Sequence, residues 1–253
     1  MIYIYYRVNS IVDNTIGNVP MISCILVEPE SPGNIGSIAR LMMNFGIKGP
    51  LILVNPPALN DEAYMMACNA AHLLDSSVVL DSFEKALGMV DVSISTSSEA
   101  GDEYNINRIS LLPSDIVGAI DIDSSIGIIF GRESTGLTNE EISKTDMLVS
   151  IPTDVAYPAM NISHAAAILF HELYKHPSIE KRPIKLKGAT RYEKDMLFDD
   201  FNTIVDSLEH RAYRQRNFKL VFRRVISRSF ISSREAYTLK GIIRKILSSL
   251  EER

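Results

Sequence analysis

The sequence is poor in cysteine and has no long hydrophobic run, and both absences restrict what the chain can be. Its two cysteines, Cys24 and Cys68, stand apart and fit no disulfide framework or zinc-ligand spacing, so we expect a reducing cytoplasm. No apolar run reaches the ~18 residues that a membrane-spanning helix needs, so no membrane association is expected. At 253 residues, the chain suits one sizeable domain, or a mid-sized domain with a small one.

The sequence also lacks the short motifs of several enzyme classes. It contains neither a phosphate-binding loop ending in Gly-Lys-Ser/Thr nor a full dinucleotide fingerprint. It has no Gly-x-Ser-x-Gly elbow and no cysteine–histidine pair with supporting spacing. His164 and His171 fall on nearly the same face of a predicted helix, but no cysteine or carboxylate accompanies them at ligand spacing. We therefore expect packing or surface histidines and no metal.

Residues 21–175 alternate between strand and helix patterns. Short continuous apolar runs predict strands buried on both faces, at Ile22–Val27, Leu51–Val54, Val78–Leu80, Val92–Ser95, Ile126–Phe130 and Met147–Ile151. Helical patterns lie between them, at Gly36–Phe45, Glu62–Leu73, Phe83–Gly88, Asn139–Lys144 and Ile162–Tyr174. Residues 99–114, with their glycine, asparagines and proline, predict a long loop. The expected fold class is α/β, with a mostly parallel sheet covered on both sides.

Three further segments flank this unit. Residues 1–20 carry one arginine and no long apolar stretch, so we expect a loose extension or a segment that is not native, with Met21 as the natural start. Residues 176–190 form a basic linker whose prolines discourage helix. Residues 191–253 predict a small all-α domain of three helices, with apolar positions between Leu197 and Leu208, over about Arg216–Arg228, and between Leu239 and Leu250.

Charge divides the chain into two parts of opposite sign. Residues 1–176 hold 8 Lys and Arg against 21 Asp and Glu, a formal charge of −13. Residues 177–253 hold 18 against 10, a formal charge of +8. A basic segment beside an acidic body favours a polyanionic partner such as nucleic acid. The alternative is a solvated helical bundle with surplus Lys and Arg.

Three loops follow predicted strands and lead into predicted helices. The first, PGNIGSIAR at residues 32–40, has glycines that allow a tight turn, and Asn34 can cap the helix. If the helix begins near Gly36, Arg40 lies about one turn in, at the end where an anion would bind. Taken alone, the segment is better explained as a plain strand–helix turn with a surface arginine.

The second and third loops are GRESTGLTNEE at residues 131–141 and IPTDVAYPAMNIS at residues 151–163. Thr138 and Glu141 form a capping box, which explains both fully. Capping does not explain the adjacent charges of Arg132 and Glu133 at the end of a buried strand, so this pair is a site candidate. In the third loop the prolines stiffen the backbone, which could then grip an adenine-like ring, and Asn161 can cap the next helix. Three such loops predict one composite site at the carboxyl ends of parallel strands.

Taken together, the three segments resemble the SPOUT superfamily of RNA methyltransferases, and more closely its TrmH-like ribose 2′-O-methyltransferases. NIGSIAR at residues 34–40 is similar to the family's first motif, and GRESTGL at residues 131–137 to the second. The third motif corresponds to IP at residues 151–152 with MNIS at residues 160–163. The resemblance covers about residues 21–175, and three motifs in order at family spacing are specific.

The resemblance implies properties that the patterns alone do not. It implies a homodimer, and a trefoil knot in the C-terminal part of the α/β domain, built around Gly131 and residues 151–161. It also implies S-adenosylmethionine as the cofactor. The matching positions for cofactor binding are Thr96, Ser97, Ser98, Gly131, Ile151, Pro158, Ala159 and Met160. The family usually has serine where Ala159 stands, which puts that position in doubt as a catalytic one.

The resemblance also suggests a catalytic set of Arg40, Asn34, Glu133 and Asn161. A guanidinium with a pKa above ~12 is an awkward general base. We therefore favour Arg40 as a clamp on an RNA phosphate that orients the ribose 2′-OH, while an arginine base stays open. Asn34 is expected to shape the site, and Glu133 to orient Arg40 or the RNA.

The basic helical C-terminus is similar to the extension of the TrmJ subgroup, which methylates the ribose of nucleotide 32 in the tRNA anticodon loop. The resemblance makes tRNA the expected partner. The residues expected to contact RNA are Arg40, Arg132, Lys181, Arg182, Lys185, Lys187, Arg211, Arg214, Arg223 and Arg224. Three alternatives stay open: a non-catalytic RNA-binding member of the fold, a methyltransferase acting on rRNA, and a nucleotide-binding α/β enzyme of another kind.

Overall fold

The computed structural model describes residues 21–98, 108–119, 124–175, 188–229 and 231–251. Six strands form one sheet, and they are β1 (Met21–Val27), β2 (Leu51–Val54), β3 (Val78–Leu80), β4 (Val92–Ser97), β5 (Ser125–Phe130) and β6 (Met147–Ser150). All neighbouring strands are parallel, in the order β3-β2-β1-β5-β4-β6. The predicted α/β class and the six predicted strands are confirmed. Residues 1–20 lie outside the described residues.

In the described part of the chain, eight helical segments accompany the sheet, and they are α1 (Pro32–Asn44), α2 (Asp61–Ala67), η1 (Cys68–Ala70), α3 (Ala71–Asp75), α4 (Phe83–Leu87), α5 (Pro113–Ala119), α6 (Asn139–Lys144) and α7 (Ile162–Lys175). The helix predicted over Glu62–Leu73 is interrupted, because Cys68 adopts a φ of 51°. Helix α5 was missed, because Pro113 was interpreted as a loop residue although it opens the helix. Proline suits that position, where its missing N–H costs nothing.

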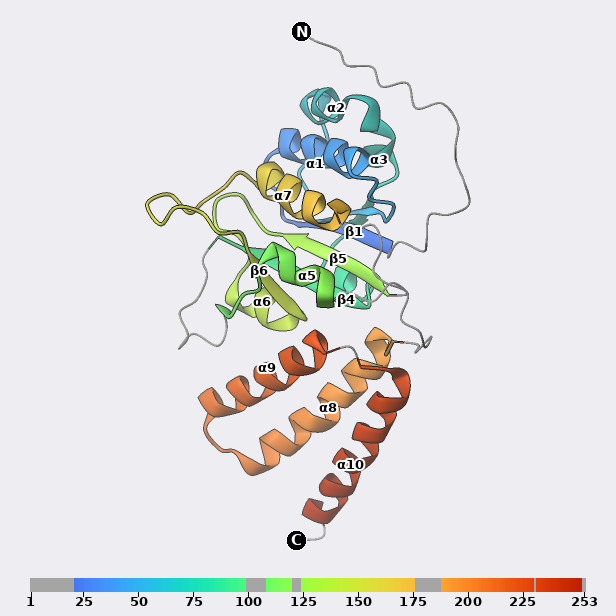
Figure 1. The fold of residues 1–253 in the computed structure, drawn as a ribbon, viewed down its shortest axis with the longest axis vertical. Helices are drawn as coiled ribbons and strands as arrows, with labels where there is room; N and C mark the ends of the chain where they lie inside the picture. The colour runs from blue at the N-terminus through green and yellow to red at the C-terminus, as the bar shows by residue number, and fades with distance from the viewer. Residues whose placement is uncertain (1–20, 99–107, 120–123, 176–187, 230, 252–253) are drawn as a thin grey trace.

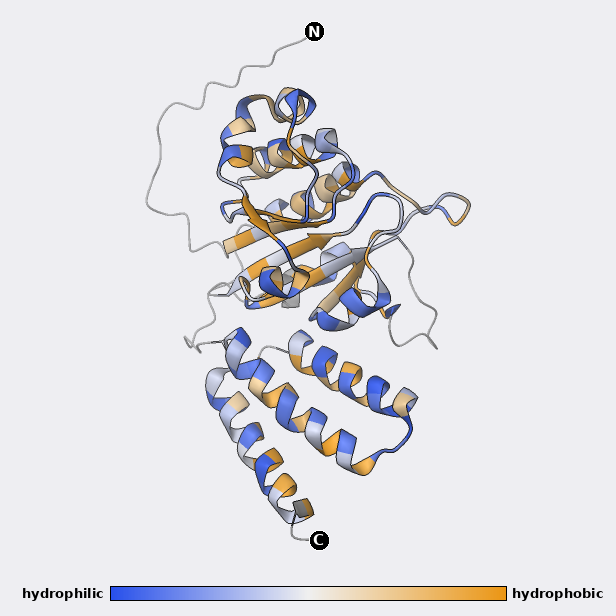
Figure 2. Ribbon diagram, turned by 180° about the vertical axis from the view of Figure 1, so that it is seen from behind, coloured by the Kyte–Doolittle hydropathy of each residue, from blue (hydrophilic) through white to orange (hydrophobic). Residues whose placement is uncertain are grey.

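Two hydrophobic cores lie on opposite faces of the sheet. Alternate residues of β1 divide between them: Cys24 and Leu26 belong to one core, Ile25 and Val27 to the other. Helices α1, α2, α3, α5 and α7 cover the first face, while α4 and α6 cover the second. Figure 2 shows the hydrophobic strands enclosed between these layers. The sheet is therefore buried on both sides, as its continuous apolar strands predicted.

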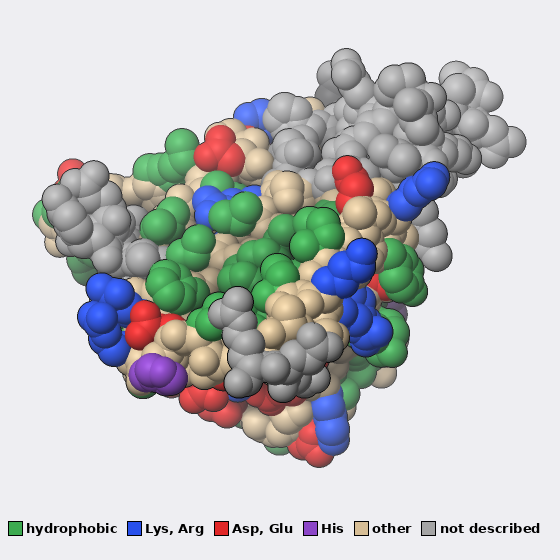
Figure 3. Space-filling view, turned by 90° about the horizontal axis from the view of Figure 1, so that it is seen from below, with side chains coloured by type: hydrophobic (Ala, Val, Ile, Leu, Met, Phe, Trp, Pro, Cys, Tyr) green, Lys and Arg blue, Asp and Glu red, His purple; other side chains and the backbone are tan. Residues whose placement is uncertain are grey.

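Three helices form the C-terminal region, and they are α8 (Arg191–Leu208), α9 (Ala212–Arg228) and α10 (Ser233–Glu251). Helix α8 lies between the other two (Figure 1), and Phe201 stacks on Phe222 of α9 at 3.8 Å between ring centroids. Seen from below, this region presents a central group of hydrophobic side chains with Lys and Arg at its edges (Figure 3). The three predicted helices are confirmed. Within the described parts of the chain, no helix is long and apolar enough to cross a membrane.

Candidate functional site

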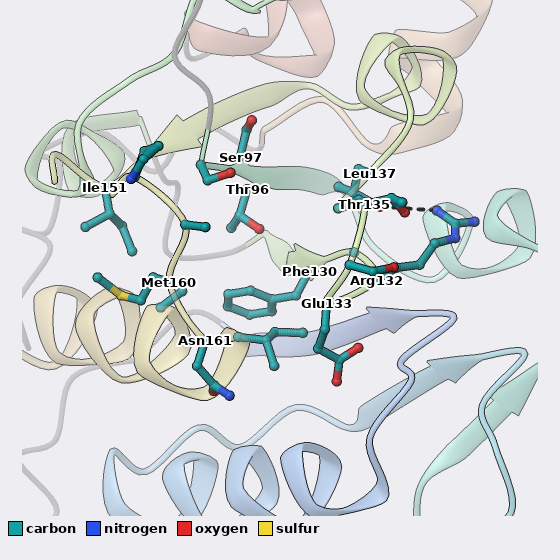
Figure 4. A pocket seen from close by; sticks show the side chains of 18 of the residues that line it. Thr96, Ser97, Phe130, Arg132, Glu133, Thr135, Leu137, Ile151, Met160 and Asn161 are labelled. Atoms are coloured by element: carbon teal, nitrogen blue, oxygen red, sulfur yellow. Dashed lines mark hydrogen bonds between the residues drawn. The ribbon is translucent and has the colours of Figure 1, made fainter. Parts of the chain in front are cut away.

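A cavity of about 740 Å³ opens at the carboxyl ends of β1, β4, β5 and β6. Its volume falls within the roughly 300–1,000 Å³ typical of small-molecule sites. Figure 4 shows Ile151 and Met160 on one side, Leu137 and Thr135 on the opposite side, and Phe130 between them. The three loops singled out in the sequence all contribute to its wall. The expectation of a composite site at this edge of the sheet therefore agrees with the geometry.

The loop between β1 and α1 is shaped by capping and by close helix packing. Ser31 caps α1 by accepting a hydrogen bond from the Asn34 amide at 3.2 Å, and Pro32 opens the helix. A Cβ on Gly36 would lie 2.0 Å from the carbonyl oxygen of Ala63 in α2. Gly36 lies inside α1 and is needed for packing against α2, rather than for the tight turn that its motif had suggested.

A chain of hydrogen bonds ties the three loops together through Glu133, Asn34 and Asn161. The Asn34 side-chain amide donates to Glu133 Oε1 at 2.9 Å. Asn161 Nδ2 donates to Asn34 Oδ1 at 3.1 Å. Glu133 also accepts from the backbone amides of Glu30 and Ser31, at 2.7 and 3.2 Å. The structure thus brings three of the four predicted catalytic residues into direct contact.

Asn161 has a second role at the start of α7. Its Oδ1 accepts hydrogen bonds from the amide and hydroxyl of Ser163, at 2.8 and 2.7 Å. Its oxygen therefore supports the helix start while its nitrogen holds Asn34. The predicted capping role and the predicted site role are compatible, because they use different atoms.

Arg132 is held by carboxylates of the protein. Its Nε and Nη2 contact Glu28 at 2.8 and 2.7 Å, and Nη1 and Nη2 each donate to Glu141 at 3.1 Å. The bonds to Glu141 raise the pKa of Arg132. Burial opposes ionisation of Glu141, but the bonds from Arg132 outweigh it and lower the pKa of that carboxyl. Capping thus does not explain Glu141 fully, and all three guanidinium nitrogens of Arg132 are engaged within the protein.

The loop after β5 depends on two glycines. A Cβ on Gly131 would lie 2.3 Å from the carbonyl carbon of Gly136 and 2.4 Å from the Leu137 nitrogen. Gly136 has a φ of 66°, in the left-handed region that favours glycine. Its amide donates to the Arg132 carbonyl at 2.8 Å, which closes a tight turn beside the cavity.

All residues predicted to bind the cofactor line this cavity, and they are Thr96, Ser97, Ser98, Gly131, Ile151, Pro158, Ala159 and Met160. The Thr96 hydroxyl donates to the Ile129 carbonyl at 2.9 Å, which fixes the end of β4 against β5. Ser97 Oγ accepts a hydrogen bond from Arg108 Nη1 at 3.0 Å. Contact of these residues with a cofactor stays a prediction.

Arg40 lies away from the other predicted catalytic residues. Helix α1 begins at Pro32 and not near Gly36, so Arg40 stands more than two turns from the helix start. Its side chain is exposed, its Nη1 lies 3.5 Å from Cys68 Sγ, and it does not line the cavity. The position about one turn into the helix was wrong. The expected contact with Glu133 is also absent among the described residues, since the bonds of Glu133 go to the β1–α1 loop.

Arg108 lies in the cavity wall, although it was not among the predicted site residues. It lies within the predicted loop of residues 99–114 and belongs to no recognisable motif. Its Nε donates to Asn139 Oδ1 at 3.2 Å and its Nη1 to Ser97, so it spans from β4 to the start of α6. A basic residue in a long loop was the one available signal in the sequence.

The residues predicted to contact RNA from the C-terminal part fall into three groups. Arg211 and Arg214 are exposed at the start of α9, 3.8 and 3.7 Å from Glu209. Arg223 and Arg224 are mostly buried, and desolvation lowers the pKa of both, that of Arg224 to about 10. The remaining four lie outside the described residues, and they are Lys181, Arg182, Lys185 and Lys187.

The structure shows the surroundings of the two histidines that were expected to pack or to lie at the surface. His171 packs edge-on against Phe45, with 6.0 Å between ring centroids, and His164 is exposed on the same helix. Within the described part of the chain, no group of three or more His, Cys, Asp or Glu residues could hold a metal ion.

Comparison with known proteins points to the same family as the three loops. The tRNA (cytidine-2'-O-)-methyltransferase TrmJ of Methanocaldococcus jannaschii is 42% identical, covering 87% of this chain and 96% of that protein. The protein of the same name from Sulfolobus acidocaldarius is 33% identical, covering 92% and 96%. The crystal structure of TrmJ from Z. mobilis ZM4 has the same fold, with a TM-score of 0.69 at 21% identity, covering 90% and 99%. The profile of the SpoU rRNA Methylase family matches residues 21–171, and the chain belongs to this family.

Proposed function

We propose that the chain transfers a methyl group from S-adenosylmethionine to a ribose 2′-OH of tRNA, at a cytidine, and that the target is nucleotide 32 of the anticodon loop. The observation that carries the proposal is the cavity in which all three family motifs meet, joined by Glu133, Asn34 and Asn161. The name of the 42% identical relative supports tRNA and cytidine. That relative aligns over 222 residues, and so extends beyond the α/β part into the basic helices. This extent favours tRNA over the rRNA alternative.

The cavity fits the cofactor that methyltransferases of this family use. Its wall combines apolar side chains of Leu137, Ile151 and Met160 with the hydroxyls of Thr96 and Ser97. Such a wall suits a ligand with a flat apolar ring and polar substituents. The cofactor would supply a methyl group already activated on a positively charged sulfur, so the protein mainly orients the ribose and removes a proton.

Within this reaction the chain's own residues have separate tasks. Asn34 and Asn161 hold the loops that form the cavity's edge, and Glu133 fixes the β1–α1 loop through two backbone amides. Arg40 would clamp an RNA phosphate and thereby orient the 2′-OH, with a phosphate oxygen as proton acceptor. Arg132 is left out of the RNA surface, because its guanidinium is satisfied by Glu28 and Glu141.

Two family properties enter the proposal as expectations. The first is a trefoil knot around Gly131 and residues 151–161, supported by a strand order in which β5 and β6 lie on either side of β4. The second is a homodimer acting in the cytoplasm. Because Arg40 is exposed and does not line the cavity of its own chain, we place its contact with RNA at the cavity of the second protomer.

The proposal is tested by incubating purified protein with unmodified tRNA transcript and radiolabelled S-adenosylmethionine. We expect ribose label at nucleotide 32, mapped by nuclease digestion and mass spectrometry, and loss of label with Arg40→Ala. A tRNA carrying a 2′-deoxy nucleotide at position 32 is the matched control and should accept no label there. Label elsewhere in the tRNA, or on rRNA only, would contradict the assignment.

Ala159 keeps a second function open, that of a non-catalytic RNA-binding protein. It lines the cavity and is exposed, but it has no hydroxyl where the family usually has serine. Binding of both tRNA and S-adenosylmethionine without methyl transfer would favour this second function. Label that appears only with Ala159→Ser would then identify the missing hydroxyl as the cause.

A further inference from the structure

The helical region docks on the α/β domain through a buried cluster of charges that no step of the proposed reaction uses. Asp146 is 0% exposed and lies between α6 and β6. Its Oδ2 accepts hydrogen bonds from the Ser93 amide and hydroxyl at 2.9 and 2.7 Å, and from Arg191 Nη1 at 3.1 Å. Its Oδ1 accepts from Ser227 Oγ at 2.9 Å, with Arg223 Nη1 at 3.9 Å. One carboxylate therefore joins β4 to both α8 and α9.

The cluster is complementary in charge across the boundary between the two parts. The α/β domain contributes Asp91 and Asp146. The helices contribute three cations: Arg191, whose amide donates to Asp91 Oδ1 at 3.3 Å, Lys194, whose Nζ donates to the Asp91 carbonyl at 3.4 Å, and Arg223. Asp195 of α8 lies 3.7 Å from Arg223 and completes three carboxylates against three cations. The charges at this boundary have the same signs as the two parts of the whole chain, which is acidic before the linker and basic after it.

Such a cluster disfavours orientations that leave one of its buried charges without a partner. A buried charge that loses its partner costs far more than a buried apolar group that shifts, so few relative positions satisfy all members at once. Asp146 is the most constrained member, because four protein groups donate to it and no solvent reaches it. The docked orientation is therefore defined mainly at this residue.

The same two strands connect the cluster to the cavity. Ser93 precedes the β4–β6 pairing that begins at Ile94 and Met147 and ends at Ser97 and Ser150. Asp146 stands one residue before β6, while Ser97 at the other end of the pairing and Ile151 just beyond it line the cavity. About four residues of parallel strand, roughly 13 Å, separate the two sites. In Figure 1 the N-terminal end of α9 and the loop of residues 151–161 project toward the same side.

We propose that Asp146 is a positioning residue for methyl transfer: it holds the basic helices in one orientation on β4 and β6, so that tRNA bound by those helices meets the cavity at the other end of the strands. The inference rests on the proposed function, since it assigns RNA binding to the helices. A tRNA that contacts both the basic helices and the cavity binds more tightly when the two are held at a fixed separation. This gain in affinity is lost when the helices turn freely relative to the cavity.

The test compares Asp146→Asn with the wild type and with Asp206→Asn. Asp206 is a matched control, because its ion pair with Lys219 at 2.6 Å joins α8 to α9 within the helical region. For Asp146→Asn we expect the KM for tRNA to rise about 10-fold or more, because two surfaces no longer bind together. We expect kcat at saturating tRNA and the Kd for S-adenosylmethionine to stay within about 2-fold, because the cavity is intact. Asp206→Asn should leave all three values unchanged.

Small-angle scattering on the free proteins supplies a readout that is independent of catalysis. We expect a larger radius of gyration for Asp146→Asn than for Asp206→Asn. A lower melting temperature with unchanged KM and radius would overturn the inference, because Asp146 would then only stabilise the fold. Loss of cofactor affinity would overturn it too, because the effect would then pass through β6 to the cavity.

Ser227→Ala keeps the inference testable if Asp146→Asn does not fold. It removes one hydrogen bond from the helical side and leaves the carboxylate with its charged partners. We expect the KM for tRNA to rise here too, but only about 3-fold, as for the loss of one hydrogen bond of modest strength, with kcat unchanged. An unchanged KM would count against the inference. Failure of the proposed function would show differently, as absence of label already in the wild-type protein.

Discussion

At the scale of single residues, Asn34 is the link on which the cavity's edge depends. It donates to Glu133 and accepts from Asn161, and so joins loops that are about 100 residues apart in sequence. We expect Asn34→Ala to lower kcat by about 100-fold, because misplacement of reacting groups by ~1 Å has effects of that size. Cofactor affinity should change by less than about 3-fold, since no residue of the apolar wall is altered. Single-turnover rates and equilibrium dialysis measure the two quantities.

The control for Asn34→Ala is Ser37→Ala, one turn further along α1. Its hydroxyl donates to the Gly33 carbonyl at 2.9 Å and does not reach the cavity. The Ser37→Ala variant should methylate tRNA at the wild-type rate. Equal losses in the two variants would mean that α1 as a whole, and not the link to Glu133 and Asn161, is disturbed.

Gly131 tests the tight turn at the residue scale. A Cβ there would overlap the backbone of Gly136 and Leu137, so Gly131→Ala should lower the free energy of unfolding by about 1–3 kcal/mol. It should also weaken cofactor binding, because the turn forms part of the cavity wall. Gly241→Ala is the matched control: it lies in α10 with no atom near the added Cβ, and should stabilise by about 0.8–1 kcal/mol. Urea denaturation with and without the cofactor measures the free energy of unfolding and the effect on cofactor binding. Gly131→Ala must lower the free energy of unfolding and Gly241→Ala must raise it.

At the scale of elements, α8 is held at its start by a capping box. Thr190 Oγ1 accepts from the Glu193 amide at 3.3 Å, and the Glu193 carboxylate accepts from the Thr190 amide at 2.8 Å. Thr190→Ala should cost about 1 kcal/mol, as for other N-cap residues. Thr203→Ala, on the exposed side of the same helix, should change stability by less than about 0.5 kcal/mol. Similar costs for both, measured by thermal unfolding, would contradict a specific role for the cap.

The elements themselves were largely predictable from local signals. The strands are continuous apolar runs because both faces of the sheet are covered, and α6 has the predicted bounds because Thr138 and Lys144 mark its ends. The start of α1 was placed too late, because Ser31 was not recognised as the cap and Pro32 as the first helical residue. That error of one turn moved Arg40 toward the site in the prediction. Local patterns thus fix which elements form more reliably than where they begin.

At the scale of the whole molecule, the sequence could not show which charges meet. The motifs placed Asn34, Glu133 and Asn161 at one edge of the sheet, because strand ends converge there. Arg108, Asp146 and Arg223 carry no motif, and each has a partner about 30 to 80 residues away. Four of the basic residues predicted to bind RNA can now be sorted by burial, which only tertiary packing determines: Arg223 and Arg224 support the fold, while Arg211 and Arg214 stay available at the surface.

The docked arrangement should respond to acid through Asp146. Burial opposes its ionisation, but Arg191 and Lys194 outweigh burial, so the folded pKa lies below the unfolded value of about 3.9. A lowered pKa stabilises the fold above the unfolded pKa, and that contribution is lost as the pH falls through the folded pKa. At pH 7 Asp146→Asn should cost about 3–5 kcal/mol, because it breaks a buried pair. The difference from wild type should shrink below about pH 4, measured by urea denaturation at several pH values; a constant difference down to pH 3 would contradict this.

The proposed homodimer allows a test of where Arg40 acts. Arg40→Ala and Asn34→Ala should each be nearly inactive alone. If Arg40 serves the cavity of the second protomer, a mixed dimer of the two variants has one cavity with both residues intact, and activity returns on mixing after subunit exchange. If Arg40 serves its own cavity, every cavity in the mixed dimer lacks one residue, and mixing restores nothing. We expect the first result, because Arg40 is exposed and lies six residues, nearly two turns, beyond Asn34, the last residue of α1 that lines the cavity. Methylation measured against the fraction of each variant in the mixture should peak near equal amounts, where mixed dimers are most abundant. Mixing one variant with Ser37→Ala protein calibrates the subunit exchange, since the Ser37→Ala protomer retains both Arg40 and Asn34.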